Sequence, residues 1–183
     1  MSVNYAILTL LQAKPRSGYD LKKAIQASAY MPWSGNNNQI YKALAQLCAE
    51  GLLASETLHR EDGPTKKIYR LTEGGQCALR AWVHAAAPEA PEMRSLFLIQ
   101  LEAAAALEPG LVQALLERYR AQVHNEWIMQ KEIGRRKKNA AGTDASWIAD
   151  ILDDNVLRFY QSELDWVDAA LVAAGAAGKD DKP

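Results

Sequence analysis

The 183-residue chain is long enough for one medium domain or two small ones, and its 49% hydrophobic and 23% charged residues are typical of a soluble globular protein. No apolar run approaches the roughly 20 residues that span a bilayer, and the N-terminus lacks a signal-peptide pattern, so we expect a cytoplasmic protein. The net charge of −1 hides an asymmetry: residues 1–84 carry 10 basic against 6 acidic side chains, whereas residues 85–183 carry 11 against 16. Since phosphate binding depends on local charge, the N-terminal part is the better candidate for contact with a polyanion.

The first fifty residues predict three helices. Apolar residues recur at helical spacing over 3–13 and predict the first helix. Ser17 is a candidate N-cap for the second, with Asp20 at the capping-box position three residues later. The asparagines at 36–38 supply N-cap candidates for a third helix, and Gly51 stands where a C′ glycine would end it.

A hairpin is predicted after the third helix. Segments 52–60 and 67–71 are typical of strands, and the charged breakers at 61–64 predict the turn between them. Thr72 then caps a fourth helix. The order helix, helix, helix, hairpin, helix is the layout of a winged helix-turn-helix, so the expected fold class is mostly α with a small β-wing.

Residues 84–91, rich in alanine and containing two prolines, are the expected domain boundary. Beyond it the pattern predicts three more helices, over 94–107, from Pro109 to about 138, and from 143 or 144 to about 174. The domains expected are therefore a winged helix-turn-helix DNA-binding domain at 1–84, a helical dimerisation domain at 92–174 and a flexible tail at 175–183.

The two longest predicted helices carry broad apolar stripes. One short neighbouring helix cannot cover both stripes, so part of their apolar surface needs a partner. A second copy of the same chain is the simplest partner, and we expect a homodimer.

Motifs in the N-terminal part resemble those of the PadR family of transcriptional regulators. Their order and spacing agree over residues 3–84. The residues that carry the resemblance are Ala6, Ile7 and Leu8; Ser17, Gly18, Tyr19, Asp20 and Leu21; Gln39, Ile40 and Tyr41; Leu44 and Leu47; Glu50, Gly51 and Leu52; Gly63, Pro64, Lys67 and Tyr69; Leu71, Thr72 and Gly75; Leu79 and Trp82. The remainder resembles, more loosely, the helical C-terminal domain of the longer family members. Lys42 departs from the family pattern, in which proline often follows the Gln-Ile-Tyr triplet.

This layout and the resemblance together point to three sets of DNA-binding residues. The third helix should enter the major groove with its N-terminal end leading, the second helix should touch the backbone, and the wing should contact phosphate. The candidates are Asn36, Asn38, Gln39, Tyr41 and Lys42 in the third helix, Tyr19 and Lys22 in the second, and Arg60, Thr65, Lys66 and Lys67 in the wing. The asparagines have a simpler alternative role as helix caps, and Lys42 one as an exposed helix residue.

The expected function is sequence-specific regulation of transcription, most simply as a repressor that binds an inverted-repeat operator as a homodimer on double-stranded DNA. The resemblance implies release by a small aromatic or lipophilic effector, for which Trp127 and Trp166 are candidates, although aromatic residues at helical spacing are more often core. The alternative is a winged-helix module that binds protein without specific DNA binding.

Nothing in the sequence predicts an enzyme. The three histidines, His59, His84 and His124, lie in a strand, at the domain boundary and on a long helix, and no phosphate-binding glycine loop or metal-ligand spacing appears. No catalytic residue, metal or cofactor is therefore expected, and no membrane partner.

Overall fold

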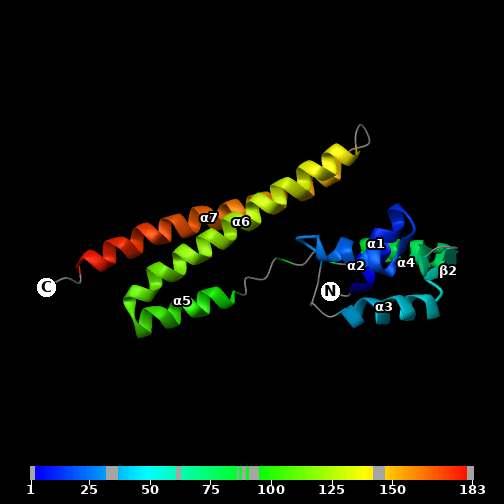
Figure 1. Ribbon diagram of the computed structural model, residues 1–183, viewed down its shortest axis with the longest axis horizontal. Helices are drawn as coiled ribbons and strands as arrows, with labels where there is room; N and C mark the ends of the chain where they lie inside the picture. The colour runs from blue at the N-terminus through cyan, green and yellow to red at the C-terminus, as the bar shows by residue number, and fades with distance from the viewer. Residues whose placement is uncertain are drawn as a thin grey trace. The chain divides into compact units, whose positions relative to one another are not determined.

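A computed structural model describes residues 3–31, 37–60, 63–85, 87, 90, 95–141 and 147–180, and the chain divides into two compact units, Met1–Ala90 and Pro91–Pro183 (Figure 1). The N-terminal unit contains α1 (Val3–Ala13), β1 (Arg16–Ser17), α2 (Gly18–Gln26), α3 (Asn37–Ala49), β2 (Leu53–Arg60), β3 (Gly63–Leu71) and α4 (Glu73–Ala85). The C-terminal unit contains α5 (Leu96–Leu107), α6 (Pro109–Ala141) and α7 (Trp147–Asp180). The mostly helical fold with a small antiparallel sheet confirms the predicted fold class.

The core of the N-terminal unit is where the inner faces of α1, α2 and α3 meet. Leu21, Ile25, Ile40 and Leu44 are fully buried there, and Ile7 of α1 completes the contact. Burying aliphatic side chains of this size contributes about 1.5–3 kcal/mol each. The three helices therefore form one packed body, which fixes the outer face of α3 relative to the start of α2.

The start of α2 and the end of α3 are closed as the sequence predicts. Ser17 and Asp20 form a reciprocal capping box at the start of α2. Gly51 ends α3 with a φ of 72°, the left-handed conformation that glycine adopts without strain, and its N–H donates to the Cys48 carbonyl at 3.1 Å. Asn36 lies outside the described residues, so the first cap of α3 stays a prediction.

The sheet has the strand order β1-β3-β2, with both pairings antiparallel. β1 is too short for a sequence period to reveal it, and it pairs Arg16 with Tyr69 and Ser17 with Ile68. β3 begins at Gly63, earlier than the start at 67 predicted from the sequence, because the Arg60–Gly63 pair extends the hairpin toward its tip.

Thr72 joins the hairpin to α4. Its hydroxyl accepts the Gly75 N–H at 3.0 Å, which confirms the predicted cap, and donates to the Leu52 carbonyl at 2.9 Å. Trp82 of α4 stacks on Tyr5 of α1 with ring centroids 4.4 Å apart, so the hairpin and α4 are tied to the helical core.

In the C-terminal unit, α6 and α7 lie side by side as a long hairpin, and α5 packs on the first part of α6 (Figure 1). Buried residues mark the seam: Ala104, Leu116, Val123, Leu164 and Val167. α7 continues past Ala174, where the sequence predicted its end, because Gly175 is flanked by alanines, the strongest helix formers. None of the described helices is both long enough and apolar enough to cross a membrane.

Candidate nucleic-acid interface

The outer face of α3 is polar and exposed. The buried side of α3 is formed by Ile40, Ala43, Leu44 and Leu47. Because successive residues are rotated by about 100° around the helix axis, the residues between them lie on the opposite, outward side. The described polar side chains on the outer part are all exposed: Asn38, Gln39, Tyr41, Lys42 and Gln46. A helix whose outward side carries amides, a phenol and a cation suits a groove lined by hydrogen-bonding base edges.

Tyr41 rests on the first residue of α2. A Cβ placed on Gly18 would lie 2.8 Å from Tyr41 Cε1, closer than side chains tolerate, so glycine is what lets the ring lie there. Tyr41 is nevertheless 49% exposed, and Tyr19 on the next position of α2 is 55% exposed. The side chains of Tyr19 and Tyr41 therefore both lie at the surface, where the start of α2 is close to α3.

An open hollow of about 400 Å³ lies where the start of α2, the first turns of α3 and β3 meet. It is lined by Ser17, Gly18, Tyr19, Tyr41, Thr65, Lys66, Lys67 and Tyr69. Five of the eleven predicted DNA-binding residues are thus brought together in one place, from three elements that are up to fifty residues apart in the chain. Ser17, Gly18 and Tyr69 were not predicted as site residues, although the Ser-Gly-Tyr motif was the signal that could have identified the first two.

Lys66 is tied to the start of α2 by Asp20. The Lys66 Nζ lies 3.0 Å from Asp20 Oδ2, and the Ser17 hydroxyl donates to the same oxygen at 2.7 Å. The Ser17 hydroxyl, followed by Lys66, lowers the pKa of Asp20 below its ordinary value, so this carboxylate stays ionised at neutral pH. The wing cation therefore has a fixed position, about 40% exposed beside the hollow.

The other two lysines near the hollow pack over aromatic rings. Lys23 Nζ lies 4.8 Å from the centroid of the Tyr19 ring, and Lys67 Nζ lies 5.5 Å from that of Tyr69. Contact with Tyr19 raises the pKa of Lys23, while burial raises the pKa of Tyr69. Both lysines are exposed at the surface, as binding to phosphate requires.

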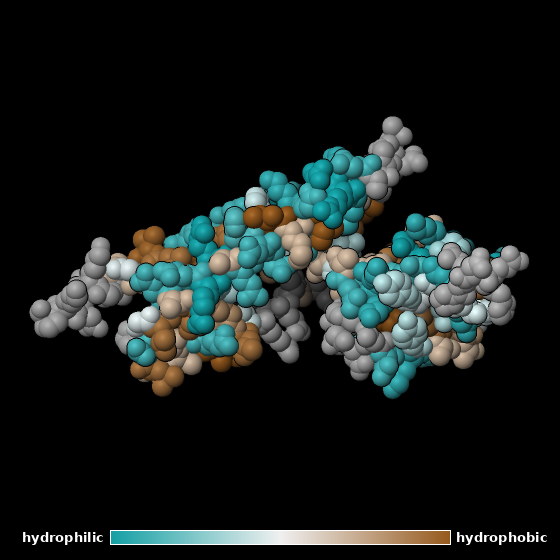
Figure 2. Space-filling view, in the orientation of Figure 1, coloured by the Kyte–Doolittle hydropathy of each residue, from teal (hydrophilic) through white to brown (hydrophobic). Residues whose placement is uncertain are grey.

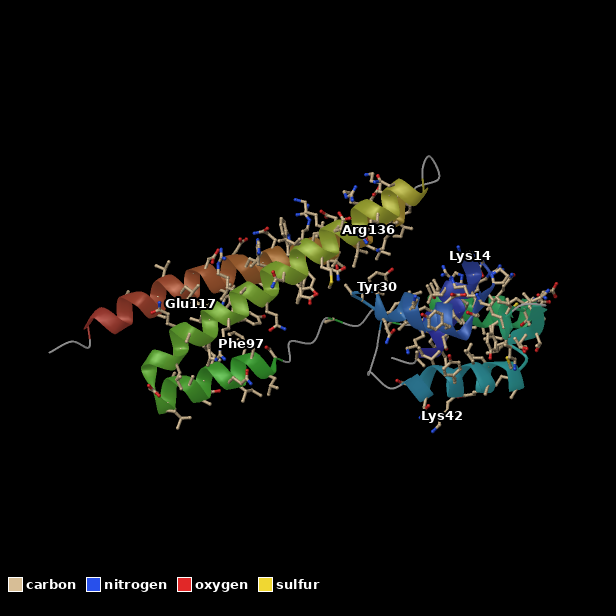
Figure 3. The ribbon with its side chains drawn as sticks, in the orientation of Figure 1. Lys14, Tyr30, Lys42, Phe97, Glu117 and Arg136 are labelled. Carbon is tan, nitrogen blue, oxygen red and sulfur yellow. The ribbon has the colours of Figure 1, made fainter. Side chains whose placement is uncertain are left out.

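Four other predicted residues are described, and they do not line the hollow. Lys22 is half-buried on α2, Asn38 and Gln39 lie in the first turn of α3, and Lys42 projects from α3 away from the rest of its unit (Figure 3). Arg60 is the last residue of β2, but its side chain lies outside the described part. The charges that do occur along the hairpin include an exposed pair between Arg70 and Glu56, which the sequence did not predict.

The two tryptophans proposed for an effector have different surroundings. Trp127 on α6 stacks with His124 and has Lys131 Nζ 4.7 Å above its ring. Trp166 on α7 meets Phe97 and Tyr119 edge to face, each with centroids 6.3 Å away. Helical spacing alone could not reveal this difference, because it does not fix the register of one helix against another.

A polar pair accompanies the aromatic cluster around Trp166. Phe97 and Tyr119 stack with centroids 3.8 Å apart, and the Tyr119 hydroxyl donates to Glu163 at 2.6 Å. Burial and this hydrogen bond to a carboxylate raise the pKa of Tyr119 far above its ordinary value. Phe97, Tyr119 and Glu163 were not predicted as site residues.

Across the described residues, no group of three His, Cys, Asp or Glu side chains could hold a metal ion.

Each of the two units matches a known protein family model. Residues 7–81 match the family model described as Transcriptional regulator PadR-like family, and residues 93–173 match that described as Virulence activator alpha C-term. The curated Negative transcriptional regulator PadR of Bacillus subtilis (strain 168) is 35% identical over 89 residues, which are 48% of this chain and 49% of that protein. The matches to curated relatives thus span only about half of the relatives' length.

The fold of both units is found in solved structures. The crystal structure of Bacillus subtilis PadR in complex with operator DNA gives a TM-score of 0.80 at 20% identity and covers 94% of this chain and 98% of that one. That of the same protein in complex with p-coumaric acid gives 0.71 at 21% identity and covers 94% of each. Over residues 7–81 the chain is therefore similar to the PadR-like family of transcriptional regulators.

Proposed function

We propose that this protein regulates transcription by sequence-specific binding to double-stranded DNA, most simply as a repressor. The observation that carries the proposal is the hollow where α2, α3 and β3 meet, since its phenols and lysines border the polar outer face of α3. In this arrangement α3 enters the major groove while α2 and the wing hold the flanking phosphates. Such a regulator acts in the cytoplasm and needs no catalytic residue, metal or cofactor.

The residues proposed to bind DNA have separate roles. Asn38, Gln39 and Lys42 on α3 are assigned to the base edges, as is Asn36, which lies outside the described residues. The residues assigned to the DNA backbone are Tyr19, Lys22, Tyr41, Arg60, Thr65, Lys66 and Lys67. This division assigns sequence preference to α3 and most of the salt-dependent affinity to α2 and the wing.

The experiment is selection of bound sites from random duplexes with the full chain, followed by fluorescence anisotropy on a selected and a scrambled duplex. We expect an inverted repeat and tighter binding to the selected duplex by at least about a thousandfold, as is typical of specific binding. Equal binding to both duplexes would reject sequence-specific regulation and would favour the protein-binding use of a winged helix.

A homodimer supplies the two DNA-binding units that an inverted repeat needs. In the single chain the C-terminal unit has large exposed apolar side chains on all three helices, and Figure 2 shows this surface gathered over α5. They include Leu96, Ile99 and Leu107 on α5, Ile128 and Met129 on α6, and Trp147, Ile151, Phe159 and Val172 on α7. A second copy of the chain could cover this exposed apolar surface. The surface therefore supports the assignment of the C-terminal unit, 92–174, as the dimerisation domain.

We also propose that a small aromatic compound releases the protein from DNA. The support is the p-coumaric acid complex of the Bacillus subtilis relative, together with the aromatic residues around Trp166 and the partly exposed Trp127. Titration of the protein–operator complex with p-coumaric acid should lower the anisotropy of labelled operator, because a ligand that favours the unbound conformation shifts the population toward it. Unchanged anisotropy across a panel of phenolic acids would exclude this class of effector.

A further inference from the structure

Lys42 lies at the centre of the side of α3 that faces away from the core; the residues along this side are called the outward line. Residues that follow at i, i+4 and i+7 share one side of a helix, and here they are Asn38, Lys42 and Ala45, opposite the buried Ile40 and Leu44. Figure 3 shows Lys42 projecting away from the N-terminal unit, whereas Lys14 projects from the opposite side of the same unit. No other position of α3 combines a cation with this central placement.

The neighbours of Lys42 leave it free to reach into a groove. Tyr41 leans toward Gly18 on one flank, and Gln46 on the other flank donates its amide to Glu50 at 2.8 Å. Among the described residues, none forms an ion pair or a hydrogen bond with Lys42. Ala45, one turn further on, adds little bulk, so the helix backbone can come close to the groove floor.

We propose that Lys42 reads a guanine in the major groove of each half-site, a role that rests on the proposed DNA-binding function. Guanine presents two acceptors there, N7 and O6, and an ammonium group with three N–H donors fits both. A residue on the central outward line faces base edges, whereas residues on the flanks of the helix face the two phosphate walls. Lys42 is therefore a specificity-determining residue, and Tyr41, which lines the hollow beside the wing lysines, is a backbone contact.

The test compares Lys42→Ala with Lys14→Ala, which removes the same charge from the opposite side of the unit. Sites are selected from random duplexes with each protein, and affinities for the selected and scrambled duplexes are then measured. We expect the wild type and Lys14→Ala to select the same guanine in each half-site. Lys42→Ala should lose that preference and bind the selected duplex about 5- to 150-fold more weakly, with little change on the scrambled one.

A chemical substitution in the DNA makes the test independent of folding. Replacing the selected guanine by 7-deazaguanine removes the N7 acceptor and keeps the base pair. The wild type should bind this duplex more weakly than the unmodified one, and Lys42→Ala should bind both equally.

Two outcomes overturn the inference while leaving the proposed function in place. One is an equal loss for Lys42→Ala on selected and scrambled duplexes together with a salt slope lower by about 1, which is the behaviour of a phosphate contact. The other is unchanged base preference in the selected sites. If the wild type selects no site at all, the proposed function fails and the inference fails with it.

Discussion

At the residue scale, Asp20 is the side chain that connects two elements of the candidate interface. One carboxylate caps α2 through Ser17 and holds Lys66 of the wing, so it links two elements on either side of the hollow. A carboxylate on a surface meant for phosphate is unfavourable by itself. Its pairing with Lys66 offsets that charge and fixes the lysine, so Asp20 has a positioning role.

Asp20 should also make the stability of the fold depend on pH. Its pKa is lowered in the folded protein, whereas an unfolded aspartate has a pKa near about 3.9, so its contribution is present above that value and is lost as pH falls through the lowered folded pKa. We expect Asp20→Asn to reduce the free energy of unfolding by about 0.5 kcal/mol at pH 7, a figure discounted for solvent screening of this partly exposed side chain.

The measurement for Asp20 is urea unfolding at pH 7 and at pH 3. The difference between wild type and Asp20→Asn should shrink at the lower pH. Gln26→Ala, at an exposed position of the same helix, should give a difference that does not change with pH. A constant difference for Asp20→Asn would mean that the stabilising effect does not depend on the charge of the carboxylate.

At the element scale, α4 is held to the hairpin by a contact that only glycine allows. A Cβ on Gly75 would lie 2.2 Å from the Leu52 carbonyl oxygen, a backbone atom that cannot move away, whereas one on Gly74 would meet only ordinary contacts of 3.6 Å. We expect Gly75→Ala to destabilise the protein by about 1–3 kcal/mol, and Gly74→Ala to change stability by less than about 1 kcal/mol. Thermal unfolding of the pair checks this, and equal melting temperatures would contradict the close approach.

The wing, β2 with β3, makes its own prediction. Replacing both Lys66 and Lys67 by alanine should weaken binding to every duplex and lower the salt slope by up to about 2, because each lysine that neutralises a phosphate releases counterions. Arg80→Ala, an exposed cation on α4, serves as the control and should leave the slope unchanged. Anisotropy titrations over a range of salt concentrations measure both, and an unaltered slope for the double variant would remove the wing from the interface.

How far the sequence predicts the elements depends on their length and on their signals. All seven helices in the described part of the chain have a periodic stripe or clear Pro, Gly or cap signals at their ends, and each was predicted. β1 was missed because two residues have no period, and β3 was predicted too short because Gly63 and Pro64 are usually turn residues, yet the hairpin register continues through them. The hollow was half predicted: motifs identified Tyr19, Tyr41 and the wing lysines, but the Asp20–Lys66 pair depends on tertiary packing that no local pattern encodes.

At the scale of the whole molecule, the C-terminal unit is the part that we propose joins two copies of the chain. α6 and α7 are joined by ion pairs, among them Lys137 with Asp153 at 2.8 Å, and Arg120 with Asp168. Ion pairs at the surface are screened by solvent and add little to stability. The apolar side chains that remain exposed on α7 are therefore the stronger candidates for holding two copies together.

Phe159 is the residue with which to test the dimer. It is 61% exposed in the single chain, so Phe159→Ser should leave the fold intact and raise the dimer dissociation constant at least about tenfold, given about 1.5–3 kcal/mol for burying a side chain of this size. Gln122→Ser, at an exposed polar position of α6, is the control. Analytical ultracentrifugation measures the constant, and a wild type that sediments as a monomer at micromolar concentration would contradict the homodimer.

In a genome, we expect the ion pair between Lys66 and Asp20 to weaken binding to sites other than the operator. A regulator must find one operator among roughly 10⁶–10⁹ competing stretches of duplex, to which it binds through charge alone. A lysine that is already paired with a carboxylate gains less binding free energy from a phosphate contact than an unpaired lysine would. The pair therefore weakens nonspecific binding to DNA. At the operator, contacts along α3 supply the additional free energy, and the exchange of Asp20 for phosphate becomes favourable. Asp20 would thus shorten the residence time of the protein on random DNA without lowering its affinity for the operator.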